Sequence, residues 1–303
     1  MIRTVTGDIR PAALGICSAH EHLLGRPHDP AADEDLCLTD ERAATAELAG
    51  FSAAGGRALV EMSPADYGRD AAGLARLAHA SGVQIICTTG NHKEAISRWQ
   101  VGDDSIGALA ERYIRDIVVG IGDTGVRAGV IKAGSSHEVI TPLERRVFAA
   151  AALAHHATGA PISTHTEAGT MALEQIALFA AHGVAPQHLL IGHLDRRMHL
   201  PFLCAVADTG ATIGFDQFGK PRYGTDEQRI AMLVQLCDHG YGRQVTLGGD
   251  HARRSSWACH GGATGLAHLP QRIMPALRAA GLADTTIDHL VRGNAARVLS
   301  FAR

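Results

Sequence analysis

The sequence predicts an α/β protein, a (β/α)₈ barrel that forms one domain over residues 1–303. Eight short apolar runs alternate with helix-like segments, and this pattern is typical of parallel strands joined by right-handed crossovers. The length of 303 residues suits one barrel, which takes about 250 residues, and no linker rich in proline, serine or charge divides it. Histidine, lysine and aspartate end several runs, where barrels carry their catalytic groups.

An open, doubly wound sheet is the alternative architecture for the same alternation of strands and helices. Such a sheet commonly binds a dinucleotide through a Gly-x-Gly-x-x-Gly turn after its first strand. The first apolar run, residues 12–17, leads instead into Ser18-Ala-His-Glu-His22. The barrel is therefore the favoured prediction.

The first strand is predicted to carry His20 and His22 at its end. Side chains alternate across a strand, so these two histidines should project to one side and Glu21 to the other. Two imidazoles on one face can bind one metal ion. Because the chain holds 18 histidines, a pair this close can also arise by chance.

The remaining elements follow in order. After a polar loop over residues 23–40, a helix is expected at 40–54, with Asp40 as N-cap and Gly55-Gly56 as the stop. Further strands are expected at residues 58–62, 83–88, 126–132, 161–165, 189–193, 211–215 and 244–247. Helices are expected between them and after them, at residues 70–81, 105–119, 142–158, 170–182, 200–208, 226–239, 269–280 and 285–299.

Four more chemically selective residues end the predicted strands: Lys132, His165, His193 and Asp250. Taken singly, the two histidines could be hydrogen-bonded interior residues, and Asp250 could cap a following helix. An inward-facing lysine in an apolar strand needs a partner or a changed charge state. Because the strand ends of a barrel meet at one mouth, their co-location favours a metal site.

Four histidines and one aspartate are more ligands than one tetrahedral zinc ion uses, which predicts two metal ions. A protonated Lys132 beside two dications would be repelled. Its neutral amine can instead react with carbon dioxide, and the resulting carbamate is an anion with two oxygens that can bridge both ions. Lys132 is therefore expected to be N6-carboxylysine. Zinc is the expected metal, with Mn²⁺, Co²⁺, Ni²⁺ and Fe²⁺ as alternatives.

This series of ligands, in this strand order, resembles the phosphotriesterase family of the amidohydrolase superfamily. The local sequences that carry the resemblance are Thr4-Val-Thr-Gly7, Ala19-His-Glu-His-Leu23, Ile131-Lys-Ala-Gly134, Ser163-Thr-His-Thr166, Ile191-Gly-His-Leu-Asp195 and Gly248-Gly-Asp250. The resemblance implies that His20, His22 and Asp250 hold a buried metal, that His165 and His193 hold an exposed one, and that carboxylated Lys132 bridges them. One departure lies near the C-terminus, where Asn294-Ala-Ala-Arg297 replaces the family's Asn-Pro-Ala-Arg.

The expected activity is hydrolysis of a small polar or phosphorylated sugar lactone by a metal-bridged hydroxide, with Asp250 as the catalytic proton carrier. The segment 250–257 resembles the pattern of phosphorylated sugar lactonases, which implies that Arg253 and Arg222 bind the phosphate. Ser256 stands where those enzymes have tyrosine. The arginines could instead be solvated or paired with carboxylates such as Asp216 and Asp226. A phosphotriesterase or carboxylesterase with a more apolar pocket, and a metal-bearing binding protein without turnover, are the alternative functions.

Composition excludes other classes of partner. A net charge of −3 argues against nucleic acid, and so against a metal-dependent nuclease barrel that begins with the same two histidines. No apolar run reaches the roughly 20 residues that span a bilayer, so no membrane partner is expected. Six scattered cysteines and the lack of a secretion signal favour free thiols and a cytoplasmic location. A homodimer is possible.

Overall fold

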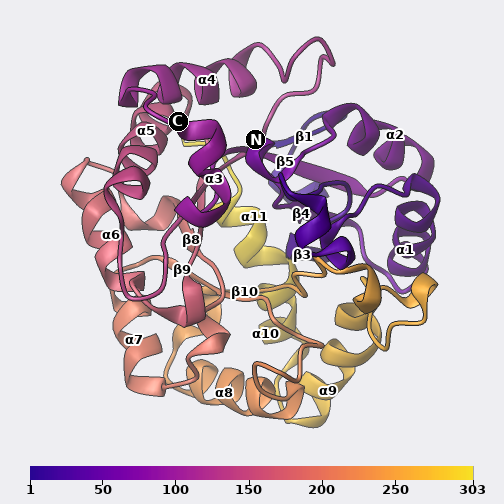
Figure 1. Cartoon of the computed structure of the whole chain (residues 1–303). Coiled ribbons are helices and arrows are strands. Elements are labelled where there is room, and N and C mark those ends of the chain that lie inside the picture. The colour runs from indigo at the N-terminus through magenta and orange to yellow at the C-terminus, as the bar shows by residue number, and fades with distance from the viewer. Residues whose placement is uncertain (303) are drawn as a thin grey trace.

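The computed structural model describes residues 1–302, in which eight parallel strands form a nearly closed barrel with helices around it (Figure 1). The strand order around the barrel is β10-β9-β8-β7-β6-β5-β4-β3. The strands are β3 (Cys17–Glu21), β4 (Ala58–Glu61), β5 (Gln84–Gly90), β6 (Val130–Gly134), β7 (Ile162–His165), β8 (Leu189–Ile191), β9 (Thr212–Phe215) and β10 (Val245–Leu247). The predicted (β/α)₈ barrel is confirmed.

Hydrogen bonds from the segment after β10 to β3 bring the two ends of the sheet together. The Asp250 backbone N–H donates to the His20 carbonyl over 2.9 Å. The Glu21 carboxylate accepts the backbone N–H groups of Gly249 and His251, each over 3.0 Å. Glu21 thus points away from the two histidines beside it, as strand alternation predicted, and ties the first strand to the last loop.

The helices occupy most of the predicted positions. They are α1 (Glu41–Ala53), α2 (Ala71–Ser81), α3 (Glu94–Val101), α4 (Ile106–Val118), α5 (Pro142–Thr158), α6 (Ala172–Ala181), α7 (Leu200–Asp208), α8 (Asp226–Asp238), α9 (Met274–Ala279), α10 (Asp284–Asp288) and α11 (Asn294–Val298). Asp40 caps α1 as expected, since its side chain accepts the N–H groups of Arg42 and Ala43. Figure 1 shows α1, α2 and α4 to α9 around the outside of the strands.

Several local expectations were wrong. The first apolar run, residues 12–17, is strand only at its last residue, because β3 begins at Cys17. Pro11–Ala13 is a 3₁₀ helix, since proline fixes φ and cannot donate to a ladder. Strand β6 begins at Val130 rather than at residue 126. A short antiparallel hairpin, β1 (Ile2–Thr4) with β2 (Gly7–Ile9), was not foreseen. Helix α3 was also missed, since Lys93 at its N-cap makes no side-chain capping bond.

The C-terminal helices are less regular than predicted, because π-helical turns at Leu269–Ile273 and His289–Gly293 precede α9 and α11. Ala295, where the family usually has proline, is buried in α11. The Asn294 amide beside it donates to the carbonyls of Gly242 and Val245 over 2.9 and 2.7 Å. Helix α11 is therefore firmly attached to the start of β10 without the proline.

The core has two parts. Inward-facing residues such as Val60, Ile86, Val130 and Leu190 form one apolar cluster with Val298 of α11. Outward-facing strand residues pack against the surrounding helices in a larger cluster. In residues 1–302, none of the helices has both the length and the apolar character that a bilayer crossing requires. The apolar cluster fills the inside of the barrel, and the polar side chains lie beyond it, at the carboxyl ends of the strands.

Candidate metal centre

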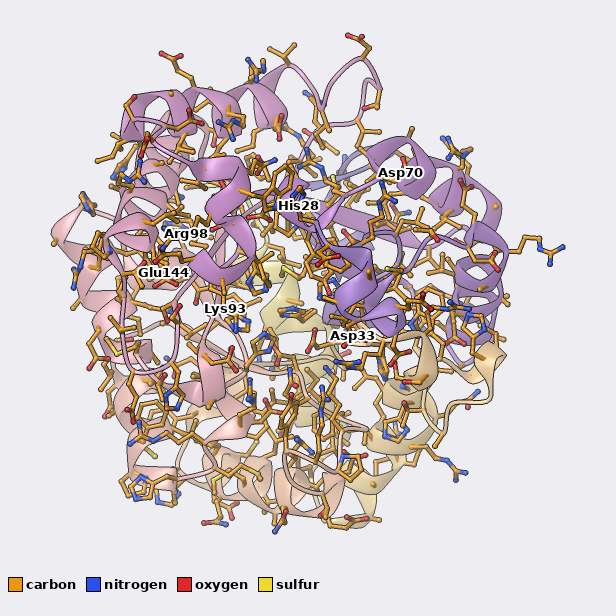
Figure 2. All side chains as sticks on the ribbon, viewed as in Figure 1. His28, Asp33, Asp70, Lys93, Arg98 and Glu144 are labelled. Carbon is orange, nitrogen blue, oxygen red and sulfur yellow. The ribbon has the colours of Figure 1, made fainter. Side chains whose placement is uncertain are left out.

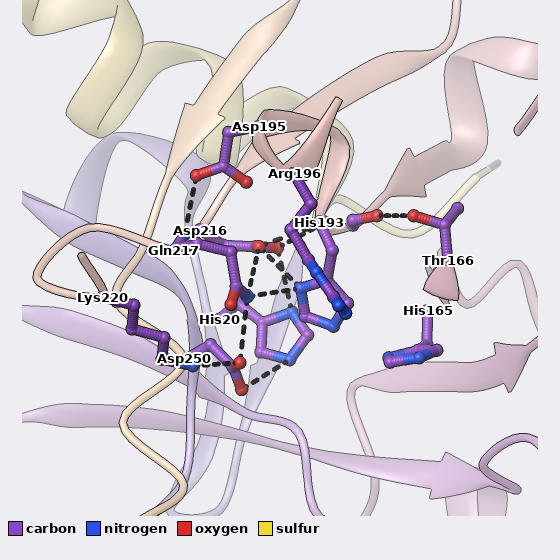
Figure 3. A network of polar contacts seen from close by, with 12 residues as sticks. His20, His165, Thr166, His193, Asp195, Arg196, Asp216, Gln217, Lys220 and Asp250 are labelled. Atoms are coloured by element: carbon purple, nitrogen blue, oxygen red, sulfur yellow. Dashed lines mark hydrogen bonds and ion pairs between the residues drawn. The ribbon is translucent and has the colours of Figure 1, made fainter. Parts of the chain in front are cut away.

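The strand ends bring the predicted residues to one cleft of about 240 Å³. Its lining includes His20, His22, His165, His193 and Asp250, and Lys132 is fully buried in β6 beside β7. Figure 3 shows His20, His193 and Asp250 side by side, with His165 across from them. The geometry thus places together side chains that come from the first strand of the barrel and from the loop after the last.

His20, His22 and Asp250 form the first group of potential ligands. The Nε2 atoms of His20 and His22 lie 3.7 and 3.2 Å from Asp250 Oδ1, and these three residues could together hold a metal ion. On its other side, His22 Nδ1 is 2.7 Å from Ser63 Oγ. This bond fixes the His22 ring and leaves Nε2 directed to Asp250.

His165 and His193 form a second pair, with ring centroids 4.6 Å apart. His193 Nδ1 lies 2.7 Å from Asp216 Oδ1, and Asp216 Oδ2 lies 3.2 Å from His20 Nδ1. His165 Nε2 lies 3.2 Å from Glu167 Oε2, while its Nδ1 is buried with no hydrogen-bond partner among residues 1–302. Each ring therefore has one nitrogen engaged by an outer partner and one that remains available to a ligand.

The charge states of these groups suit metal binding, which requires neutral imidazole and ionised carboxylate. Burial lowers the pKa of His20 to about 3 and holds the pKa of His165 well below its usual value. Burial alone would raise the pKa of Asp250, but the Lys220 ammonium and the hydrogen bond with His22 keep it well below its usual value.

Lys132 Nζ is fully buried and has no hydrogen-bond partner in the described part of the chain. Burial lowers the pKa of Lys132 to about 8, although nearby carboxylates oppose the shift. A larger fraction of the amine is therefore neutral near pH 7 than for a free lysine. The neutral amine is the form that reacts with carbon dioxide, which fits the expected carbamate. An orphaned buried amine amid potential ligands fits a bridging anion better than a structural lysine.

We expect the metal-free protein to gain stability as the pH rises from 8 to 10.5. The pKa of Lys132 is about 8 in the folded chain and 10.5 for a solvated lysine, so the unfolded chain binds more protons in this window. The free-energy penalty for burying the protonated Lys132 amine is fully present below pH 8 and decreases above it. Denaturant unfolding of metal-free wild type at pH 8 and at pH 10.5 should show that the free energy of unfolding rises by roughly 2 kcal/mol. Lys132→Met should lack this rise. If the unfolding free energies of wild type and Lys132→Met depended equally on pH, this prediction would be contradicted.

Asp250 lies in the left-handed region with φ 48°, beyond the end of β10. Its Oδ2 accepts from Gln217 Nε2 over 2.9 Å and from the Lys220 ammonium. The capping alternative is wrong, because the next helical turn begins only at Arg254, with Arg253 as its N-cap. Asp250 thus faces the cleft with one oxygen toward the histidines and the other held by loop side chains.

The two predicted phosphate ligands lie at the rim. Arg222 and Arg253 both line a second hollow of about 310 Å³, together with Lys220 and Ser256, and Arg222 also lines the main cleft. Arg253 donates to Asp33 and Asp35 over 2.7 and 3.2 Å (Figure 2 labels Asp33). The alternative that loop carboxylates pair with the arginines therefore holds for Arg253, although its partners are carboxylates of the first loop.

Asp216 and Asp226 were the carboxylates suggested as partners of the arginines, but each has another partner. Asp216 bonds His193 and lies beside His20, and it could itself be a third ligand with them. Asp226 bonds His268 over 2.6 Å. Asp216 directly follows a predicted strand, so the strand-end rule used for the other ligands could have identified it.

Other functional candidates escaped the sequence reasoning because they lie in loops rather than at strand ends. Glu167, Lys93 and Arg196 line the cleft beside His165, and Gln217 contacts Asp250. His92 also lines the cleft, with its ring 4.6 Å from that of His165. No local spacing distinguishes such residues from ordinary polar loop residues.

Eight parallel strands with histidine, lysine and aspartate at their carboxyl ends define the class of α/β-barrel hydrolases. The chain belongs to the phosphotriesterase family, whose sequence profile matches residues 1–299. This confirms the resemblance carried by the sequence motifs. The family comprises hydrolases of small-molecule substrates.

Three similar proteins illustrate the relationship. The phospho-furanose lactonase of Mycoplasmopsis synoviae (strain 53) is 30% identical over 324 residues, which cover 99% of this chain and 91% of that protein. The structure of a lactonase from Listeria monocytogenes has a TM-score of 0.95 and 31% identity, and covers 100% of this chain and 99% of its own. The phosphotriesterase homology protein from Escherichia coli, complexed with phosphate in its active site, has a TM-score of 0.92, 36% identity, and coverage of 95% and 99%.

Proposed function

We propose that this chain is a binuclear metal-dependent lactonase that opens a small polar or phosphorylated sugar lactone. The observation that carries the proposal is the convergence of four histidines and Asp250 on one cleft that adjoins a second hollow lined by Arg222 and Arg253. Lys132 lies fully buried in the neighbouring strand β6, and its Nζ has no hydrogen-bond partner among residues 1–302. Turnover of a lactone or ester would distinguish this enzyme from a metal-bearing binding protein, which needs the same ionised ligands. The lactonase names of two similar proteins support the same activity.

One metal ion would be held by His20, His22 and Asp250, and the other by His165 and His193. Carboxylated Lys132 would be a ligand of both. When bound, two divalent ions would lower the pKa of a water molecule and polarise the lactone carbonyl. Imidazole and carboxylate ligands fit zinc, and they also accept Mn²⁺, Co²⁺, Ni²⁺ or Fe²⁺. Metal analysis of the purified protein, with a screen of lactones and esters, tests the proposal.

The chain's own groups would then position the substrate and move a proton. Asp250 would accept the proton of the attacking water on its carboxylate and donate it to the leaving oxygen of the opened ring. Gln217 and Lys220 hold Oδ2 of this carboxylate. The hydrogen bonds from these two residues would fix its orientation during the transfer.

The second hollow would bind the substrate's phosphate. Arg222, Lys220 and Arg253 lie on its wall, and charged hydrogen bonds to phosphate are among the stronger ones. Arg222 connects this hollow to the main cleft, so a lactone held at the metals could extend its phosphate there. Phosphate in the active site of the Escherichia coli protein supports an anion-binding region in this family.

A carboxylesterase or phosphotriesterase with an apolar substrate is the second candidate. A hollow lined by Pro27, His28, Ile96 and Trp99 favours it, because Ile96 also lines the main cleft. Trp99 is 48% exposed, and His28 stacks on it with ring centroids 4.3 Å apart. An aryl or acyl group could rest against these rings.

The phosphate assignment predicts a substrate contrast. We expect Arg222→Ala and Arg253→Ala each to lower kcat/KM for a phosphorylated sugar lactone by roughly ten- to a hundredfold, since a charged hydrogen bond contributes about 1.5–3 kcal/mol. The same lactone without phosphate should be hydrolysed at nearly the wild-type rate. Steady-state kinetics on the two substrates measures the contrast.

Arg254→Ala is the matched control, because Arg254 is exposed on the same loop and lines neither hollow. Equal losses on both substrates would indicate damage to the metal centre instead. If wild type favours an aryl ester over every lactone, the second candidate replaces the first.

A further inference from the structure

Glu167 joins the candidate metal ligand His165 to side chains from two other loops. It lies in the 3₁₀ turn Glu167–Gly169, directly after β7. Its Oε2 contacts both His165 Nε2, over 3.2 Å, and the ammonium of Lys93. Its Oε1 accepts from Arg196 Nη1 over 2.8 Å. One carboxylate therefore links the segments that follow β5, β7 and β8.

This cluster lies at the cleft and not on the outer surface. Glu167, Lys93 and Arg196 all line the cleft, and their side chains are between 17% and 23% exposed. Figure 2 shows Lys93 near the centre of the view, where the loops converge, and Figure 3 shows Arg196 close to His193. The carboxylate thus lies within a shell of polar side chains that surrounds the potential ligands.

The contact with Glu167 decides which nitrogen of His165 can bind a ligand. An ionised carboxylate only accepts hydrogen bonds, so His165 Nε2 must carry the proton and Nδ1 the lone pair. That Nδ1 is buried and has no hydrogen-bond partner among the described residues. Lys93 and Arg196 keep the carboxylate in place, because both of its oxygens are held by cations from other loops.

We propose that Glu167 is a positioning residue that presents Nδ1 of His165 to the exposed metal ion, and that Lys93 and Arg196 hold Glu167 for this task. The inference rests on the proposed metal centre. It assigns His165 a ligand atom different from the Nε2 atoms that His20 and His22 direct to Asp250. The pairing is typical of metal-binding histidines, whose second nitrogen bonds a carboxylate.

The test compares metal binding by Glu167→Gln and by wild type, both freed of metal by chelation and titrated with Zn²⁺. We expect the dissociation constant of one of the two ions to rise by roughly ten- to a hundredfold, and that of the other to change less than about threefold. Glu174→Gln is the control, because Glu174 is exposed on α6 and loses the same charge. Unchanged constants, or equal losses of both ions, would overturn the inference.

A second measurement needs neither bound metal nor a change at Glu167. In metal-free wild type with ¹⁵N-labelled histidine, we expect His165 to be the tautomer with a protonated Nε2, assigned by loss of its signals in His165→Asn. The opposite tautomer would overturn the inference. Wild type that binds fewer than two ions would instead refute the proposed metal centre, and the tautomer would still test the pairing with Glu167.

Discussion

Lys132→Met is expected to lose both metal ions and nearly all hydrolytic activity while it remains folded. Lys132 is fully buried at the barrel interior, and its Nζ has no hydrogen-bond partner in residues 1–302. Loss of a residue that only supports a ligand costs about 10–100-fold in affinity or activity. Loss of a ligand shared by two ions should cost more, so we expect kcat/KM to fall by at least about 100-fold.

Metal analysis of purified wild type and variant measures the ion content, and kinetics on the best lactone or ester measures turnover. Methionine has nearly the shape of the lysine stem and needs no hydrogen bond, so the metal-free variant should be at least as stable as metal-free wild type. Thermal unfolding of both proteins is the control for folding. A Lys132→Met protein with two ions and full turnover would refute the carbamate bridge.

Asp250→Asn is expected to lower kcat by at least about 100-fold, the usual scale for removal of a positioned proton carrier. The Asp250 backbone has φ 48°, a conformation that asparagine adopts as readily as aspartate. The substitution therefore removes charge and basicity without new backbone strain. Lys220 would lose its carboxylate partner as well.

The pH dependence of kcat separates the possible proton carriers. Wild-type kcat should fall on the acid side through one ionisation below neutrality, as the activated water takes up a proton. Asp238→Asn, an exposed change on α8, should leave both kcat and this profile intact. If Asp250→Asn stays within a few-fold of wild type, another group moves the proton.

The sequence by itself predicted the barrel and the main candidate ligands. Strand and helix signals are local, so the α5 and α7 ranges were predicted with their observed ends. The strand-end rule placed His20, His165 and Asp250 correctly at the cleft, because parallel strands deliver their carboxyl ends to one face. The errors arose where local signals were weak, as in the uncapped α3.

Only the tertiary structure decided which atoms meet. The bonds of Arg253 to Asp33 and Asp35 span 220 and 218 positions, and that of Asp216 to His193 spans 23. Sequence periodicity reports which face of an element is buried, but it contains no distance between loops. The choice of nitrogen on His165 depends on Glu167 in the turn that follows β7, and that carboxylate is held by Lys93 and Arg196 from two other loops. Such contacts form because the barrel brings the loops of different strands together, and this happens only in the folded chain.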